Sequence, residues 1–242
     1  MKRFFVFSLL LIVVFSSCGE IFGNRIRGNG IIKTESRSSG EFTAVDVSGA
    51  FDLYIRQDSA RSIRIEADEN LMKHIETISD GQRLIIRPEG GYNLKPTGNI
   101  KVYVSSPVFK RLEASGACDI YSENKIITDH ELFIDLSGSC NVKIELHALK
   151  VSADLSGSCD INLKGETKDF KVAGSGSTDI KSMDLLAENV SIDISGSGSA
   201  EVFASVKLDV DISGSGSVKY RGNATVNQNI SGSGSVKKVE EF

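Results

Sequence analysis

A short serine–glycine motif recurs along the second half of the chain, and a regular repeat constrains the fold more than any other feature. The motif reads Ser-Gly-(Ser/Ala)-x-polar-apolar, as in residues 197–202. Its copies begin at Ser48, Ser115, Ser137, Ser156, Ser175, Ser197, Ser215 and Ser233. From Ser115 onward, successive copies begin 18 to 22 residues apart. A period of about 20 residues is typical of proteins built from stacked repeats.

Apolar residues alternate with polar residues within each copy. The pattern is clearest at Val190, Ile192, Ile194, Leu208, Val210 and Ile212. A period of two residues indicates strands and not helices. Glycines such as Gly196 fall on the same face as these apolar residues, where a missing side chain permits a sharp bend or a close backbone approach. Each repeat is therefore expected to contain a strand, a glycine corner, a second strand and a variable connection.

No single repeat can bury its own apolar face, whereas stacked repeats can. We predict an all-β fold, a right-handed parallel β-solenoid (β-helix) with repeats of about 20 residues that are regular from about residue 108. An antiparallel sandwich is the alternative that short strands and glycine turns allow. One short helix is expected near the N-terminal end, at residues 68–78, with Asp68 as its N-cap and with Leu71, Ile75 and Ile78 on one face.

The first residues have the three parts of a secretory signal: Lys2-Arg3, an apolar run over residues 4–15, and Ser16-Ser17 before Cys18. The apolar run is too short to span a bilayer comfortably. Small residues before a cysteine resemble the lipobox of bacterial lipoproteins, which implies cleavage before Cys18 and acylation of Cys18. We expect a signal peptide at 1–17, a lipidated tether at 18–29 and a folded head at 30–242, held at the outer membrane of a cell envelope. An ordinary signal followed by a chance cysteine is the alternative.

The charge of the chain bears on its partners. The formal net charge is −4, and removal of Lys2 and Arg3 with the signal changes it to −6. A mildly acidic chain without a basic cluster is a poor nucleic-acid binder. The expected partners are the membrane, through the lipid anchor, and a glycan or a surface protein.

Several segments together resemble a known family. They are the leader, Phe42-Thr43-Ala44-Val45-Asp46-Val47-Ser48-Gly49, Asp68-Glu69-Asn70-Leu71, the repeated Ser-Gly-Ser turns and the closing segment Ile230-Ser231-Gly232-Ser233-Gly234-Ser235-Val236. Over roughly residues 30–238 the chain resembles the head GIN domain family of auto-transporter adhesins, which is common in the Bacteroidetes envelope. The resemblance implies surface attachment. It supplies no catalytic or binding residue to carry over.

Polar residues on the outward face beside the corners form the candidate interaction face. They are Ser137, Ser156, Ser175, Ser195, Ser213, Ser231, Asp135, Asp154, Asp193 and Asp211. A repeated hydroxyl and carboxylate surface could accept a glycan or a partner protein. The alternative is that the serines only satisfy corner backbone groups and that the acids are solvated.

A second set of acids follows the corners, at Asp119, Asp160, Asp179 and Glu201. Stacked carboxylates repel one another. A hard cation such as Ca²⁺ would relieve that repulsion. A calcium-stabilised binding module is therefore an alternative to a metal-free fold.

Cys118, Cys140 and Cys159 occupy the same register in three successive repeats and are expected to point inward. Free cysteine packs like a small apolar residue. Neighbouring turns would also bring two of these thiols within reach of a disulfide, and export makes oxidation possible. Packing, one disulfide and a thiolate metal site all remain open.

The sequence offers little support for catalysis. His74, His130 and His147 are scattered, and the Ser-Gly-Ser-Gly corner lacks the strand-to-helix turn of a nucleophile elbow. Arg83, Arg87 and Lys101 could join a groove of the kind that polysaccharide lyases use. We predict a non-catalytic, lipid-anchored envelope adhesin without a cofactor, with a glycan-active enzyme as the alternative.

Overall fold

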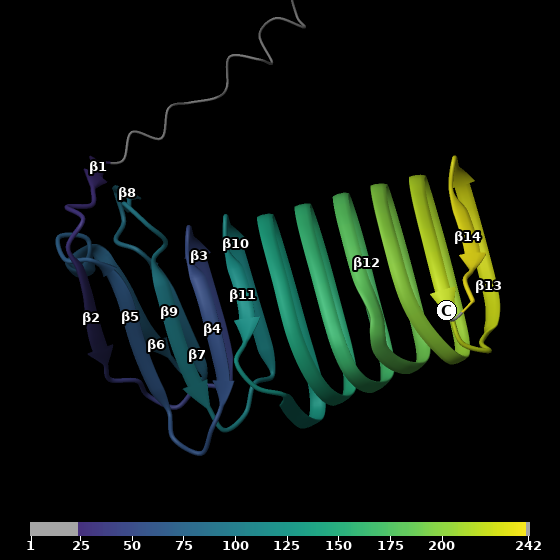
Figure 1. Ribbon diagram of the computed structural model, residues 1–242, viewed down its shortest axis with the longest axis horizontal. Coiled ribbons are helices and arrows are strands. Elements are labelled where there is room, and N and C mark those ends of the chain that lie inside the picture. Colours follow the sequence, from purple (N-terminus) through teal and green to yellow (C-terminus); the bar gives the residue numbers. More distant parts are fainter. Residues whose placement is uncertain (1–23, 241–242) are drawn as a thin grey trace, which may run out of the picture.

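The computed structural model describes residues 24–240, which form strands along most of their length (Figure 1). The strands before the long coiled element are β1 (Asn24–Arg27), β2 (Ile32–Arg37), β3 (Ala44–Gly49), β4 (Asp52–Gln57), β5 (Ser62–Asp68), β6 (Ile75–Asp80), β7 (Arg83–Pro88), β8 (Tyr92–Lys95), β9 (Lys101–Ser106), β10 (Arg111–Gly116) and β11 (Asp119–Ser122). The remaining strands are β12 (Ile126–Arg221), β13 (Thr225–Gly232) and β14 (Ser235–Lys238).

Strand β12 is 96 residues long. At about 3.3 Å per residue, a straight strand of that length would extend for roughly 300 Å. Figure 1 shows instead that β12 winds through successive turns, coloured teal to green. Each turn bends at a glycine with positive φ, for example Gly157 (φ 101°) and Gly214 (φ 128°). Glycine adopts this conformation without the steric penalty that a β-carbon brings.

The repeat motif stacks in register from turn to turn. Ser48 pairs with Ser115, Ser115 with Ser137, and Ser213 with Ser231, all in parallel strands. The predicted alignment of these corners is confirmed. The alignment differs in the last three copies, where Gly196 lies against Gly176. Ser195, and not Ser197, therefore lies opposite Ser175. From this turn onward the corner contains one additional Ser-Gly pair, for example Ser197-Gly198, and is two residues longer.

The predicted right-handed parallel β-solenoid with one helix is wrong. The large sheet has mixed strand order, β2-β5-β9-β4-β11-β12-β10-β3-β7-β6, and it curls around the core until it almost closes on itself, as in a barrel. Antiparallel pairs join β2 to β5, β5 to β9 and β6 to β7. The physical reason is that tight turns, such as the one at Gly81 (φ 62°), reverse the chain in the N-terminal part. The Ser-Gly repeat has only one copy in that part, at Ser48.

The helix expected at residues 68–78 is also wrong. Asp68 ends strand β5, a single 3₁₀ turn η2 (Met72–His74) follows, and β6 begins at Ile75. The apolar spacing that suggested a helix comes from two elements in succession. Leu71 and Ile75 are buried, but Ile78 is 37% exposed, so the three side chains do not share one face.

None of the described residues forms a helix that is long and apolar enough to cross a membrane.

The core is one continuous apolar column inside the curled sheet. The alternating residues predicted to face inward, such as Ile192, Ile194 and Val210, are buried. Phe42, Phe51, Phe109 and Phe170 are also buried. Burial of each such side chain contributes about 1.5 to 3 kcal/mol. The inward alternation fixes which side chains face outward, and this determines the site described next.

Candidate functional site

A shallow groove of about 610 Å³ follows the outward face along β3, β10 and successive turns of β12. We call it the acid–serine groove. Its lining includes these residues of the predicted interaction face: Asp135, Ser137, Asp154, Ser156, Ser175, Asp193 and Ser195. It also includes Asp46, Arg83, Glu113, Ser115 and Ala173. The predicted residues Asp211, Ser213 and Ser231 lie outside this lining.

Parallel register builds the groove. Asp46 pairs with Glu113, and Glu113 pairs with Asp135, so their carboxylates form one column across β3, β10 and β12. The serines two residues further along each strand form a second column on the same face, because side chains at i and i+2 point the same way. Ala173 takes the place of an acid on its turn and lines the groove between Asp154 and Asp193.

Two arginines compensate the acids at one end of the groove. The Arg83 guanidinium lies 3.6 Å from the Asp46 carboxylate and 3.1 Å from the Glu113 carboxylate. Arg111 lies 3.6 Å from Glu113 and also pairs directly with Asp135. The carboxylates of Asp46, Glu113 and Asp135 are therefore each paired with an arginine.

The other end of the groove has no such compensation. Among residues 24–240, Asp154 and Asp193 form no ion pair, and the Ser156 and Ser195 hydroxyls donate no hydrogen bond to the protein. Ser175 donates only a 3.4 Å hydrogen bond to the Leu155 carbonyl. Ser175 thus bonds weakly to a backbone group, as the alternative interpretation requires, whereas Ser156 and Ser195 do not. This end of the groove presents unused acceptors and hydroxyls to solvent.

The second set of acids, beyond the corner, is arranged differently. Asn141 Nδ2 donates to Asp119 at 2.7 Å, Lys181 lies 2.7 Å from Asp179, and Lys219 lies 3.0 Å from Glu201. Amide and ammonium groups therefore relieve the carboxylate repulsion at three of the four acids, whereas Asp160 has no such partner within residues 24–240. The part of the chain that the structure describes contains no group of three or more His, Cys, Asp or Glu residues that could hold a metal ion.

Burial of Asp179 alone would raise the pKa of its carboxyl group. Hydrogen bonds from Lys181 and Ser199 outweigh that effect, so the pKa lies below its ordinary value. The carboxylate consequently stays ionised and paired at neutral pH.

Cys118, Cys140 and Cys159 are buried free thiols. Their sulfurs lie 3.4, 3.5 and 3.4 Å from the carbonyl oxygens of the corner residues Ser115, Ser137 and Ser156, respectively. Burial raises the pKa of all three thiols, and it raises the pKa of Cys118 to about 12. Buried neutral thiols of this kind pack as small apolar groups.

The residues considered for catalysis do not converge. Arg83 lines the acid–serine groove, whereas Arg87 pairs with Glu76 at 2.8 Å and Lys101 lies beside Asp52 on β4. The three histidines pair with three separate acids, at Glu89, Asp129 and Glu166.

One aromatic cluster was not predicted from the sequence. Tyr54 stacks between Tyr103 and Tyr121, with ring centroids 4.8 and 5.3 Å apart. The Arg64 guanidinium lies 3.8 Å over the Tyr103 ring. A signal existed in the sequence, because Tyr54 and Tyr121 each stand six residues after a motif serine, at Ser48 and Ser115.

The predicted lipid anchor Cys18 lies outside the described residues.

Comparisons with solved structures identify relatives of similar fold. A "putative adhesin" from Bacteroides fragilis is 23% identical, covers 88% of this chain and 100% of its own, and superposes with a TM-score of 0.83. A "Putative lipid binding protein" from Parabacteroides distasonis is 25% identical, covers 90% of this chain and 100% of its own, and has a TM-score of 0.74. A "putative adhesin" from Parabacteroides merdae is 21% identical, covers 90% and 100%, and has a TM-score of 0.62. No protein with a curated function matches the chain.

The family comparison agrees with the sequence resemblance. Residues 41–224 match the family described as "Putative auto-transporter adhesin, head GIN domain". That range includes β3 to β11, all of β12 and the whole lining of the acid–serine groove. An adhesin family implies a place at the cell surface and binding in preference to catalysis. The chain belongs to the head GIN domain family of adhesins.

Proposed function

We propose that this protein is a non-catalytic adhesin, anchored in the outer membrane through acylated Cys18, that binds its partner along the acid–serine groove. The partner is a glycan or a surface protein that donates hydrogen bonds to repeated carboxylates and hydroxyls. The observation that carries the proposal is that, within residues 24–240, Asp154 and Asp193 form no ion pair and the Ser156 and Ser195 hydroxyls donate no hydrogen bond.

Repetition determines how such a face would act. Equivalent polar groups one turn apart give many weak contacts, which together hold a repetitive partner more firmly than any single contact. Loss of one serine should therefore matter little, and loss of several should weaken attachment progressively.

The test compares two triple variants in an adhesion assay on beads that carry the mature protein. The first is Ser156→Ala, Ser175→Ala and Ser195→Ala, within the groove. The matched control is Ser139→Ala, Ser158→Ala and Ser177→Ala, which lie in a separate hollow across the corner. We expect the groove variant to lower bead retention on a glycan and matrix-protein array, while the control retains it and circular dichroism is unchanged for both.

Three results would reject this proposal. They are equal retention by both triple variants, loss of retention with one single serine variant, and turnover of a glycan by the purified protein. The last result would favour the glycan-active enzyme.

Lipid binding is a second candidate function, which one specific observation favours. Ile127, Leu149 and Leu186 are 58%, 56% and 50% exposed and line a largely apolar groove of about 780 Å³ on β12. Exposed apolar grooves of that size are typical of ligand sites. One relative of similar fold carries a lipid-binding description.

A fluorescent fatty acid tests this second candidate. The variant Leu149→Ser with Leu186→Ser should lose binding, and the control Ile31→Ser with Ile32→Ser, which changes two equally exposed residues elsewhere, should keep it. Equal binding by both variants would exclude the groove.

A further inference from the structure

We propose that a second site, a hollow of about 520 Å³ at the ends of β4, β5 and β9, binds the carboxylate or sulfate groups of an acidic sugar. We call it the arginine hollow. Its lining includes Arg56, Arg61, Arg64, Tyr103, Ser62 and Ser105. It is separate from the acid–serine groove and does not depend on the proposed function of that groove.

Two of these arginines have donors that the protein does not use. Arg56 Nε lies 3.6 Å from Asp58, and Arg61 Nη1 lies 3.8 Å from Glu41, whose side chain is 87% exposed. Across residues 24–240, neither guanidinium donates a hydrogen bond to the protein. Exposed pairs this loose contribute little. A ligand oxyanion can therefore replace them at small cost.

The remaining charges at the hollow are engaged in the structure. Arg37 donates to the carbonyls of Met72 and Ile75 and serves to hold strands together. Arg64 pairs with Glu66, and its guanidinium lies over the Tyr103 ring. The carboxylates that face the hollow are Glu123, which lines it, and Glu41, Asp58 and Glu66 through the pairs described.

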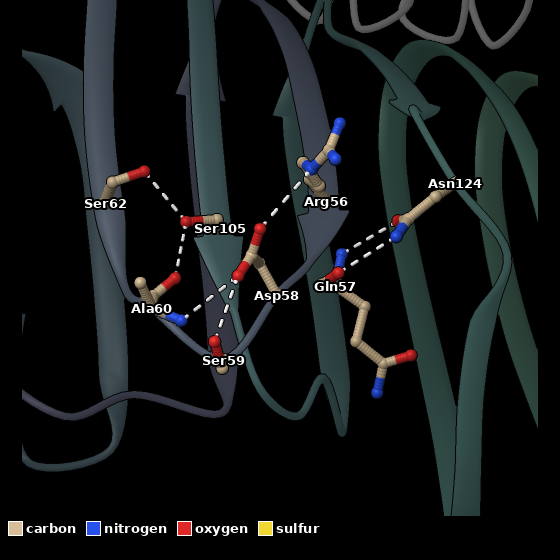
Figure 2. Close-up of polar contacts among 8 residues, drawn as sticks. All are labelled: Arg56, Gln57, Asp58, Ser59, Ala60, Ser62, Ser105 and Asn124. Carbon is tan, nitrogen blue, oxygen red and sulfur yellow. Dashed lines mark hydrogen bonds and ion pairs between the residues drawn. The ribbon is translucent and has the colours of Figure 1, made fainter.

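A hydrogen-bonded turn at residues 58–60 separates Arg56 from Arg61 in the chain, and Figure 2 shows this turn together with Arg56. Asp58 accepts hydrogen bonds from the Ala60 backbone N–H and the Ser59 hydroxyl, each at 3.3 Å. These hydrogen bonds hold the pKa of the Asp58 carboxyl below its ordinary value, and the bond from the Ala60 N–H has the largest effect. The Asp58 carboxylate therefore stays charged and keeps the turn closed at neutral pH.

Two further contacts join this turn to its neighbours. The Ser105 hydroxyl donates to the Ala60 carbonyl at 2.7 Å and lies 2.8 Å from the Ser62 hydroxyl. The Asn124 side chain accepts from the Gln57 backbone N–H and donates to the Gln57 carbonyl, both at 2.9 Å. Figure 2 shows both sets of bonds on either side of Asp58. A site that is already ordered loses less conformational entropy when a ligand binds.

The chemistry of the lining identifies the class of ligand. Guanidinium groups bind two oxygens of one carboxylate or of one tetrahedral oxyanion through paired N–H donors. Serine hydroxyls and Tyr103 line the same hollow and supply polar groups that can hydrogen-bond to the hydroxyls of a sugar. The whole chain has a net charge of −4, which opposes general attraction for polyanions. Binding of a sulfated sugar must therefore be local.

The experiment measures binding of a fluorescent heparin-derived hexasaccharide to the mature protein by anisotropy. The comparison ligand is its desulfated counterpart with the uronate carboxyls also reduced to alcohols, so that no oxyanion remains. The test variant is Arg56→Gln with Arg61→Gln. The control is Arg25→Gln with Arg27→Gln, which removes the same charge from exposed positions on β1. We expect the test variant to weaken binding of the sulfated sugar at least about tenfold, since hydrogen bonds between charged partners are the strong ones. The control variant should bind the sulfated sugar as tightly as the wild type does. The desulfated sugar should bind neither to the wild type nor to the variants.

Unchanged binding by the test variant would overturn the proposal. Equal weakening by the control would do so as well, because the effect would then be general electrostatics. Equal binding of the desulfated sugar would show that the oxyanions are not recognised. An unchanged melting temperature for both variants confirms that the fold is intact, and Arg56→Lys with Arg61→Lys should recover only part of the affinity because lysine lacks the paired donors.

Discussion

The carbonyl oxygen of Gly196 lies 2.5 Å from the point where a β-carbon on Gly214 would stand. The φ of Gly214 is 128°, a value that residues with a β-carbon rarely adopt. Gly214→Ala should therefore force apart two turns of β12 and strain the backbone. We expect a loss of about 1 to 3 kcal/mol in the free energy of unfolding, measured by urea denaturation.

Gly98→Ala is the matched control for Gly214→Ala. A β-carbon on Gly98 would have no neighbouring atom within 4 Å, and Gly98 does not have a positive φ. Its substitution should leave the unfolding midpoint unchanged or slightly raised. Equal midpoints for both variants would contradict the close approach of the corners.

The buried carboxylate of Asp68 should make stability depend on pH. Its Oδ1 accepts hydrogen bonds from the Gly30 N–H at 2.7 Å and the Thr97 hydroxyl at 2.8 Å, and its Oδ2 accepts one from the Thr97 N–H at 2.9 Å. Burial would raise the pKa of Asp68 from 3.8, but these hydrogen bonds lower it overall. A lowered pKa means that the ionised group stabilises the fold above its ordinary pKa. This contribution is lost as pH falls through the lower folded-state pKa.

Asp68→Asn should therefore lower the free energy of unfolding by about 1.5 to 3 kcal/mol at neutral pH, because an amide nitrogen replaces one of the two acceptor oxygens. The difference from wild type should shrink below about pH 4. Thermal melts between pH 2 and pH 8 measure this, with the exposed Asp80→Asn as the control. A constant difference at every pH would show that ionisation of Asp68 is not responsible.

The three core cysteines should be inert in the folded protein. Reaction with a thiol reagent requires an exposed thiolate, whereas burial raises the pKa of Cys118 to about 12 and raises those of Cys140 and Cys159. In a Cys18→Ala background, Ellman's reagent should detect no thiol at pH 8 until urea unfolds the protein. Fast labelling before unfolding would mean that the column opens to solvent.

The predicted anchor can be tested by fractionation. Cys18→Ala should move the protein from the membrane pellet to the soluble fraction, because the acyl chains provide the attachment. Cys18→Ser serves as a second variant that keeps a small polar residue at the cleavage site. Retention of both variants in the pellet would reject lipidation at Cys18.

Sequence periodicity predicted part of this structure for a definite physical reason. Alternation at Val190, Ile192 and Ile194 indicates which side chains are buried. This can be read from local sequence because successive side chains along a strand point to opposite faces of the sheet. The same alternation placed Asp154 and Asp193 on the outward face. It could not show that these residues line one groove with Asp46 and Arg83, which come from distant parts of the chain.

The errors came from pairings between residues far apart in sequence. Antiparallel pairing of β5 with β9 joins Ile63 to Val104, and no local pattern specifies that partner. The helix expected at residues 68–78 failed because Asp68 caps no helix and instead accepts bonds from Gly30 and Thr97. The arginine hollow escaped notice for the same reason, since its lining comes from four separate strands and loops.

The pairing register of the curled sheet also has a consequence for the order of folding. Thr225 pairs with Lys207 only 18 residues earlier, whereas Arg111 pairs with Ala44 across 67 residues. Closing the longer loop costs about 1 kcal/mol more in chain entropy. Local pairings also form faster than distant ones. Turns of β12 should therefore assemble before β3 pairs with β10, and they should act as the template on which β10 and then β3 dock.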